Sequence, residues 1–367
     1  MNSGERYRAA YAFRPVDRLF RKEFYIWEEA IQRWKGEGLP DDWDKRNIFN
    51  FDPPATTGNV LNLGWCEPPY FPCYEEKIIE VQGDHEIIRD FAGRTIKVFK
   101  GRRHGFMPDY LKHPVSSRKD WEEDVSLRLN PDSPERYAGL DKKIEDAGTA
   151  VQKDSLMLVQ GMVGGYMYLR SMVGPEDLLY AFYDQPNLIR EMMERWTEIM
   201  DAGLERIQSK IELDIISIGE DICYNKGMLI SPEMFREFLS RHYREVLSKA
   251  RARQKKHIYF YVDTDGYAPA AIPVFLEVGM DAMGPFEVAS GCDVVKIGKQ
   301  YPDLVMDGGI DKRVLAAGEK EIDEYLRCVI PAMKKRGGYI PMCDHGVPDN
   351  VSLKNYLHYR KRICELD

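Results

Sequence analysis

The stretch HIYFYVDTDGYAPAAIPVFLEVGMDAMGPFE, residues 257–287, decides the fold. Its first part, 257–266, is an apolar run with β propensity that ends in D-T-D-G, so it predicts a buried strand. Residues 268–279 predict a helix that closes at Gly279, and 280–287 predict a second strand. A strand, a helix and a strand at this spacing indicate a βαβ unit, in which the two strands lie parallel.

The same alternation continues on both sides of this unit. Further strand candidates, each followed by helical sequence, are residues 155–161, 213–221, 303–309 and 337–346. With one or two earlier candidates, one of them within 18–27, the count approaches the eight strands of a (β/α)8 TIM barrel, which needs roughly 250 residues. The sequence therefore predicts an α/β protein built on such a barrel. A doubly wound open sheet is the alternative, but the segment GMVGGY at 161–166 lacks the G-x-G-x-x-G spacing that would favour it.

The N-terminal part departs from the βα pattern twice. Residues 6–14, RYRAAYAFR, look helical and predict an extension before the barrel. Residues 76–101 hold three apolar runs separated by Gly-Asp and Ala-Gly turn signals, which indicate an antiparallel β meander. We therefore expect a single domain over residues 1–367, with an insertion at about 66–135 that carries the meander.

The composition narrows the class of protein. The 367 residues are 44% hydrophobic, which is ample for a large core, and carry a formal net charge of -8 without a long basic block. A nucleic-acid partner is therefore not expected. The charged N-terminus has no signal core, and nowhere do about 18 uncharged apolar residues run together, so we expect no membrane span. The seven scattered cysteines form no C-x-x-C pair, which indicates reduced thiols and a cytoplasmic protein.

Acidic residues gather where the predicted strands end. In a parallel barrel the carboxyl ends of all strands lie on one face, where barrel enzymes have their active sites. The residues in question are Glu220, Asp221, Asp263, Asp265, Glu287, Asp307, Asp311, Asp344 and His345. Strand alternation places Asp263 and Asp265 on the same side. A single aspartate after a strand is also the ordinary helix cap or turn former, and this interpretation stands for Asp307, Asp311 and Asp344. Glu287 could equally pair with a nearby lysine.

Four of these residues have the chemistry of metal ligands. They are Glu220, Asp263, Asp265 and His345. Together they would form an oxygen-rich set with one imidazole, which favours Zn²⁺, Mn²⁺, Fe²⁺ or Mg²⁺ over a thiolate site. Converging carboxylates repel each other, and a cation or a proton stabilises them. Cys343 lies two residues before His345 and could point inward with it, although an isolated cysteine is more often a small core residue.

Five segments, in chain order, carry a family resemblance. They are ERYRAAYAFRPVDRL (5–19), ISPEMFREFLSRHYREVL (230–247), FLEVGMDAMGPFEV (275–288), DGGIDKRVL (307–315) and DHGVPDNVSLKNYLHY (344–359). As an ordered set they resemble segments of the uroporphyrinogen decarboxylase superfamily. The resemblance extends over essentially the whole chain, and it implies a (β/α)8 barrel whose strand-end loops form the cleft.

The resemblance implies one of two chemistries. The decarboxylases of the superfamily remove acetate carboxyls from a porphyrinogen without metal or cofactor, holding the substrate carboxylates with arginines of an N-terminal R-Q-A-G-R-Y motif. This chain has RLFRKEFYIWEEA (18–30) there, in which only Arg21 and Lys22 are comparable cations, and Asp52 is a weak match to the aspartate that grips the pyrrole N–H groups. The methyltransferases work with methylcobalamin or a corrinoid protein and use zinc. Because the predicted rim is acidic and a tetrapyrrole polycarboxylate needs several cations, the methyltransferase branch is favoured.

Resemblance to the methyltransferases also implies the site. D-T-D-G, with Asp263 and Asp265, falls where those enzymes have H-x-C-G, and His345 falls at or beside a late cysteine ligand. Glu220 matches a glutamate ligand of ether-demethylating members, and Tyr166 corresponds to a tyrosine that faces the cleft. The expected catalytic residues are His345, Asp265 and Glu220, the expected metal ligands are Glu220, Asp263, Asp265 and His345, and the expected substrate contacts are Tyr166, Glu287 and Asp311.

The expected function is therefore a metal-dependent methyltransferase that moves a methyl group between a small substrate and a corrinoid (cobalamin) carrier. Zinc is the leading metal, the corrinoid is expected on a separate protein, and a homodimer is expected from the resemblance. Two alternatives stay open. One is a decarboxylase of a uroporphyrinogen-like or smaller carboxylate substrate, and the other is a barrel that binds a tetrapyrrole or corrinoid without transforming it.

Overall fold

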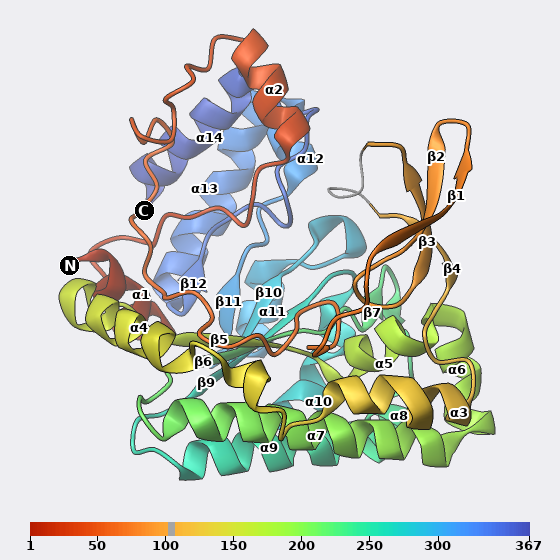
Figure 1. Cartoon of the computed structure of the whole chain (residues 1–367). Coiled ribbons are helices and arrows are strands. Elements are labelled where there is room, and N and C mark those ends of the chain that lie inside the picture. Colours follow the sequence, from red (N-terminus) through yellow and green to blue (C-terminus); the bar gives the residue numbers. More distant parts are fainter. Residues whose placement is uncertain (102–106) are drawn as a thin grey trace.

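A six-stranded parallel sheet lies at the centre of the computed structural model, which describes residues 1–101 and 107–367 (Figure 1). The strands are β5 (Val159–Val163), β6 (Ile215–Gly219), β9 (Tyr259–Thr264), β10 (Ala282–Pro285), β11 (Val305–Asp307) and β12 (Tyr339–Ile340), in the spatial order β12-β11-β10-β9-β6-β5. The expected α/β class is confirmed. Residues 257–287 form the βαβ unit read from the sequence, with helix α10 (Ile272–Glu277) between β9 and β10.

Two irregular segments, 19–27 and 52–63, stand at the open edges of this sheet, and we call them the edge segments. The second makes two parallel bridges to the chain at β5, and the first makes one, between Ile26 and Val347, beyond β12. A backbone hydrogen bond from the Asp52 N–H to the Arg21 carbonyl (2.8 Å) joins the two segments. Across the described residues no continuous ladder closes the sheet into a ring. One physical reason is the Pro-Pro pair after Asp52, which has no N–H to donate to a ladder.

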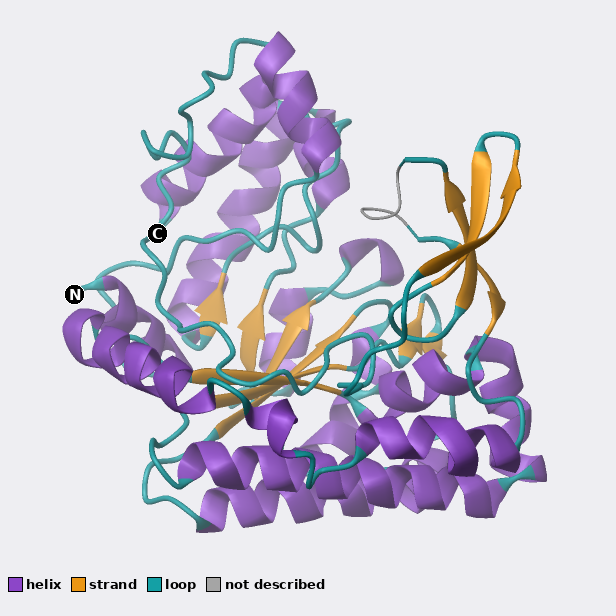
Figure 2. Ribbon diagram, in the orientation of Figure 1, coloured by secondary structure: helices purple, strands orange, loops and turns teal. Residues whose placement is uncertain are grey.

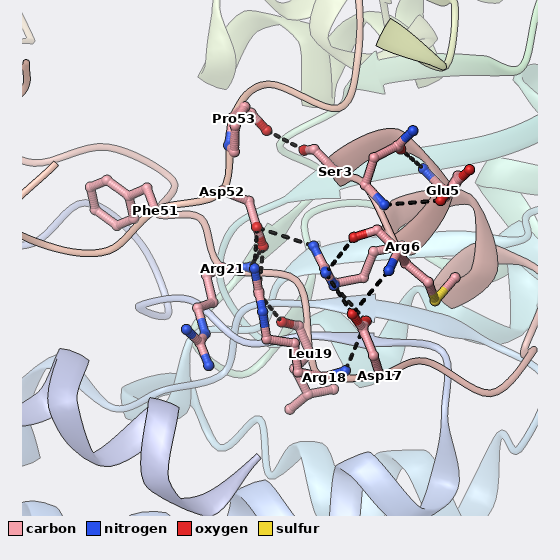
Figure 3. Close-up of polar contacts among 12 residues, drawn as sticks. Ser3, Glu5, Arg6, Asp17, Arg18, Leu19, Arg21, Phe51, Asp52 and Pro53 are labelled. Carbon is pink, nitrogen blue, oxygen red and sulfur yellow. Dashed lines mark hydrogen bonds and ion pairs between the residues drawn. The ribbon is translucent and has the colours of Figure 1, made fainter.

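A buried carboxylate, Asp52, fastens the edge segments to helix α1 (Ser3–Tyr11), as Figure 3 shows. It accepts hydrogen bonds from the guanidinium groups of Arg6 (3.1 Å) and Arg18 (2.8 Å) and from the Arg21 N–H (2.9 Å). Burial opposes ionisation, but these donors hold the pKa of Asp52 below its usual value. Helix α1 packs Tyr7 against the starts of several central strands. The expected N-terminal extension therefore closes the amino end of the sheet.

Helices surround the central sheet, and α2 lies beside the C-terminal helices at the top of Figure 1 (Figures 1 and 2). They are α2 (Glu28–Gly36), α3 (Arg118–Asp120), α4 (Leu140–Asp154), α5 (Gly165–Val173), α6 (Pro175–Asp184), α7 (Pro186–Gln208), α8 (Pro232–Phe238), α9 (Ser240–Ala252), α11 (Val294–Gln300), α12 (Lys312–Ala317), α13 (Glu319–Arg336) and α14 (Leu353–Leu366). Their apolar faces and the sheet form one large core. Within the ranges that the structure describes, no helix is both long and apolar enough to span a bilayer.

The inserted β meander is a four-stranded antiparallel sheet that stands apart from the helices at the upper right of Figure 1. Its strands are β1 (Lys77–Gln82), β2 (His85–Arg89), β3 (Thr95–Phe99) and β4 (Asp109–Lys112). The three expected runs became β1 to β3, and β4 was missed because it is short and polar. On one face Ile88, Ile96 and Val98 form a small apolar cluster of their own, separate from the main core. A hairpin of β7 (Cys223–Tyr224) and β8 (Gly227–Met228) follows β6.

Candidate active site

The carboxyl ends of β6, β9 and β12 bring three aspartates and one histidine together. Asp263 lies in β9 and Asp265 just after it, Asp221 follows β6, and His345 follows β12. Burial and the charges of Asp265 and Asp221 raise the pKa of Asp263, and the charge of His345 lowers it, so the four groups lie within electrostatic range of one another. We call Asp221, Asp263 and Asp265 the acid cluster. Strand alternation had placed Asp263 and Asp265 on one side, as observed.

Glycines beside Asp263 make room for the large side chains around it. In the ladder Asp263 lies between Gly219 of β6 and Gly284 of β10. A Cβ at Gly219 would lie 2.9 Å from the ring of Trp65, and a Cβ at Gly284 would lie 2.5 Å from the Tyr261 hydroxyl. The two glycines therefore let Trp65 and Tyr261 close the space on either side of the Asp263 carboxylate.

His345 links the acid cluster to the first edge segment. Its Nε2 lies 3.4 Å from Oδ2 of Asp265, and its Nδ1 lies 3.2 Å from the hydroxyl of Tyr25. Burial would lower the pKa of His345, but the hydrogen bond and charge of Asp265 outweigh it, so the pKa of the imidazole is raised. In the imidazolium form both ring nitrogens donate, one to Asp265 and one to Tyr25. Nε2 of His345 therefore faces the acid cluster, while Nδ1 faces the first edge segment.

The acid cluster carries more negative charge than its surroundings balance. Burial raises the pKa of Asp263 to about 8, and repulsion from Asp265 and Asp221 adds to the effect. Burial and Asp265 also raise the pKa of Asp221, against a loose contact of 3.4 Å from Nη1 of Arg170. Beneath the cluster, the charge of Lys22 acts in the opposite direction on Asp263. Without an added cation, Asp263 therefore holds its proton at neutral pH.

Glu220 follows the same strand as Asp221 but turns away from His345. Its Oε1 accepts hydrogen bonds from the Tyr243 hydroxyl (2.6 Å) and from the Tyr166 N–H at the start of α5 (3.3 Å). Its Oε2 is buried without a hydrogen-bond partner among the described groups. Burial raises the pKa of Glu220 to about 8, against the lowering effect of Tyr243. The predicted catalytic and ligand roles of Glu220 stay predictions. Its hydrogen bonds connect α5 and α9 inside the protein.

The carboxylates expected as caps or lysine partners have those contacts. Asp311 caps α12 through the Arg313 N–H (2.9 Å) and pairs with the Arg313 guanidinium (2.8 Å). Asp344 is fully buried and accepts from the Val288 N–H (2.9 Å). Glu287 pairs with Lys312 (3.2 Å). The substrate contacts predicted for Asp311 and Glu287 have no support in these bonds.

Three further residues named from the sequence lie inside the protein. Asp307 forms an ion pair with Lys22 at 2.6 Å, below the acid cluster. The Tyr166 ring is buried, and burial raises its pKa to about 12, so its predicted substrate contact would need the cleft to open toward it. Cys343 is fully buried, and its Sγ lies 3.8 Å from Asp344. It is a core thiol and not a member of the acid cluster.

Cys66, which the sequence did not single out, is a half-buried thiol within electrostatic range of the acid cluster. Burial raises the pKa of Cys66 to about 12, and the charges of Glu67, Asp221 and Asp263 add to this. The sequence also missed Tyr25 as the partner of His345. No spacing motif marks Cys66, which follows the irregular edge segment 52–63. Tyr25 could have been found only if 19–27 had been aligned with the loop after β12.

The side chains of Asp263, Asp265 and His345 have the chemistry of ligands for a divalent cation. Their positions in the structure are not close enough to hold one. In residues 1–101 and 107–367, no three His, Cys, Asp or Glu side chains stand together closely enough to hold a metal ion. Nevertheless Asp263, Asp265 and His345 offer hard oxygens and one imidazole in a place where like charges repel. These three residues fit the expected group by chemistry, and a bound ion would have to draw Asp263 to the His345–Asp265 pair. Glu220 fits less well because one of its oxygens is already bonded to Tyr243.

Two cavities adjoin this region. One, of about 680 Å³, lies between the edge segments and includes Lys22, Tyr25 and Asp52 in its lining. The other, of about 430 Å³, lies between the inserted sheet and the carboxyl face of the barrel. We call it the meander cavity, and it is lined in part by Cys66, Asp221, Arg170, Ile88 and Ile96. The meander cavity reaches the acid cluster through Asp221.

Comparisons with known proteins agree with this architecture. A family model described as Uroporphyrinogen decarboxylase (URO-D) matches residues 103–365. A methyltransferase from Methanosarcina mazei superimposes with a TM-score of 0.63 at 13% sequence identity, covering 100% of this chain and 99% of that one. The D-psicose 3-epimerase from Clostridium cellulolyticum H10 gives a TM-score of only 0.35 at 14% identity, over 67% of this chain and 93% of that one. A search of curated proteins finds no match.

Proposed function

The chain belongs to the uroporphyrinogen decarboxylase family, and we propose that it is a methyltransferase of that family that uses a divalent metal ion bound by Asp263, Asp265 and His345. The observation that carries the proposal is the convergence of Asp263, Asp265 and His345 in a place where the carboxylates need a proton or a cation to be stable. A polyanionic substrate would be repelled there, whereas a cation would be attracted. The likeness in fold to the Methanosarcina mazei methyltransferase over the full length supports the same branch.

Asp52 also argues against decarboxylation of a porphyrinogen. The decarboxylase interpretation needs a free aspartate there to grip pyrrole N–H groups. Here Asp52 is occupied by Arg6, Arg18 and the Arg21 N–H, and it holds the edge segments together. Its side chain therefore has a structural role.

The metal, with zinc as the leading choice, would act as a Lewis acid on the oxygen, nitrogen or sulfur that gives or takes the methyl group. The residues of the chain prepare that event. Asp265 holds His345 in place, and Tyr25 fixes the other ring nitrogen. Trp65 and Tyr261 occupy the space beside the two glycines that flank Asp263 in the sheet. A corrinoid on a separate protein is the carrier that this proposal requires.

A second candidate function is favoured by one observation. With a pKa of about 8, Asp263 is protonated at neutral pH in the absence of a metal, which is what a general acid needs to protonate a carbanion after loss of carbon dioxide. In that case the enzyme would decarboxylate a small substrate with few negative charges. Activity that survives chelators would favour this candidate.

The test begins with metal content, measured by mass spectrometry on protein incubated with zinc and then desalted. We expect near-stoichiometric zinc in the parent protein and its loss in the variants Asp263→Asn and His345→Ala. Glu220→Gln should retain zinc, and so should the matched histidine control His358→Ala, since His358 pairs with Asp323 on the protein surface. Zinc-dependent methylation of cob(I)alamin, followed by its absorption spectrum over a panel of methyl donors, then tests the reaction. Failure of the parent to bind zinc or any other divalent metal would remove the basis of the proposal.

A further inference from the structure

The meander cavity has the character of a small-molecule site. Its volume of about 430 Å³ lies in the range of sites that enclose one small ligand. The inserted sheet supplies the roof, with Ile88 and Ile96 facing inward, and helix α5 supplies Met167 and Arg170 from below. Because the apolar cluster of the sheet is separate from the main core, its face covers the cavity and does not pack onto the barrel.

Among the described residues that line the cavity, three side chains carry or can carry positive charge: Arg94, His113 and Arg170. Arg94 is buried and forms ion pairs through Nε with Asp90 (2.7 Å) and through Nη2 with Glu67 (2.9 Å). Burial lowers the pKa of His113, and its Nδ1 lies 3.1 Å from the Ser171 carbonyl, so this imidazole is neutral and its Nδ1 donates that bond.

Arg170 differs from both. Within the described part of the chain, its hydrogen bonds all leave from Nη1, toward Asp221, at 3.4 Å. Its side chain is 24% exposed. The Nε and Nη2 donors therefore form an edge that is available to an anion, which guanidinium groups bind with two parallel hydrogen bonds.

We infer that the meander cavity binds the small molecule whose methyl group is transferred, and that this molecule combines an apolar or aromatic body with a single carboxylate held by Arg170. That this ligand takes part in methyl transfer rests on the proposed function, whereas its binding in the meander cavity does not. The apolar walls take the body of the molecule, and Asp221 and Cys66 mark the end of the cavity that meets the acid cluster. Because Arg170 contacts Asp221, the carboxylate is held at the end of the cavity next to the acid cluster, and the apolar body extends from there along Ile88 and Ile96.

The probe is benzoate, with benzyl alcohol as its uncharged counterpart, and binding is measured by ligand-observed NMR and calorimetry. We expect benzoate to bind the parent at millimolar concentration or better, and Arg170→Gln to weaken benzoate about tenfold or more while it leaves benzyl alcohol unchanged. Arg241→Gln is the matched control, since this exposed arginine lies on α9, away from the cavity. Met167→Trp should fill the cavity and abolish binding of both probes.

Two outcomes overturn the inference. One is the absence of benzoate binding to the parent, and the other is equal binding by the parent and the folded Arg170→Gln variant. The metal measurement separates this result from the proposed function, because Arg170→Gln should keep its zinc. A parent that binds benzoate through Arg170 but holds no metal keeps the cavity assignment and refutes the metal-dependent methyltransferase. A parent that holds zinc but binds no benzoate does the reverse.

Discussion

Replacement of Glu220 by glutamine should change how stability depends on pH. Glu220 is buried, and its pKa is raised from 4.5 to about 8. The folded protein therefore binds a proton that the unfolded chain has released, over the window between these two values. The resulting stabilisation is complete below pH 4.5 and is lost as the pH rises through 8.

The size of the effect follows from the shift. For one group with these two values, linkage gives a loss of about 3.5 kcal/mol of unfolding free energy between pH 5 and pH 8. Glutamine carries no titrating proton, and its carbonyl can still accept the hydrogen bond from Tyr243. The variant should therefore lose about 3.5 kcal/mol less than the parent over this range.

Urea unfolding at pH 5, 6, 7 and 8 measures the difference directly. Glu145→Gln, on the exposed face of α4, is the control and should follow the parent at every pH. If Glu220→Gln also ran parallel to the parent, the carboxylate would be ionised in the folded protein. The assignment of Glu220 as a buried, neutral carboxyl group between α5 and α9 would then be refuted. The prediction that Glu220 is a metal ligand would gain support.

Three further predictions concern the site and its frame. Asp265→Asn removes the hydrogen bond and the charge that raise the pKa of His345, so the imidazole should titrate at a lower pH than in the parent in an NMR titration, and an unchanged midpoint would contradict the geometry. Asp52→Ala should cost about 1–3 kcal/mol of unfolding free energy in urea, because the Arg21 N–H loses its acceptor while Arg6 keeps Asp17, whereas the exposed control Asp42→Ala should stay within about 0.5 kcal/mol. Gly308→Ala should lower the melting temperature, with a cost of about 2 kcal/mol or more, since φ is +95° and a Cβ would lie 2.1 Å from a backbone oxygen; a melting temperature equal to the parent's would refute that strain.

The regular βα units could be read from the sequence because each combines a β-branched run with a periodic helix. The unit at 257–287 is the clearest example, and its strand and helix boundaries shifted by only a few residues. The first edge segment was harder to read because charged residues interrupt it, and the second because of its Pro-Pro pair. Their place beside the sheet comes from tertiary contacts that no local pattern encodes.

The sequence predicted which strand ends carry the candidate site, but it did not predict the direction in which the side chains point. Glu220 and Asp221 are adjacent, and the sequence favoured Glu220. Asp221 takes a left-handed conformation, with φ of +47°, and it is this residue that meets Asp265. Strand alternation ends with the strand, so it could not predict which of two residues beyond β6 turns inward.

The bridge between Ile26 and Val347 has a consequence for synthesis of the chain. The two residues are 321 positions apart, so the first edge segment leaves the ribosome long before its partner exists. At typical elongation rates of 5–20 residues per second, this delay is roughly 16–64 s. Throughout that time Leu19 and Phe20, which end up buried, have no completed surface to pack against. The first edge segment can therefore take its place beyond β12 only after nearly the whole of the described chain has been made.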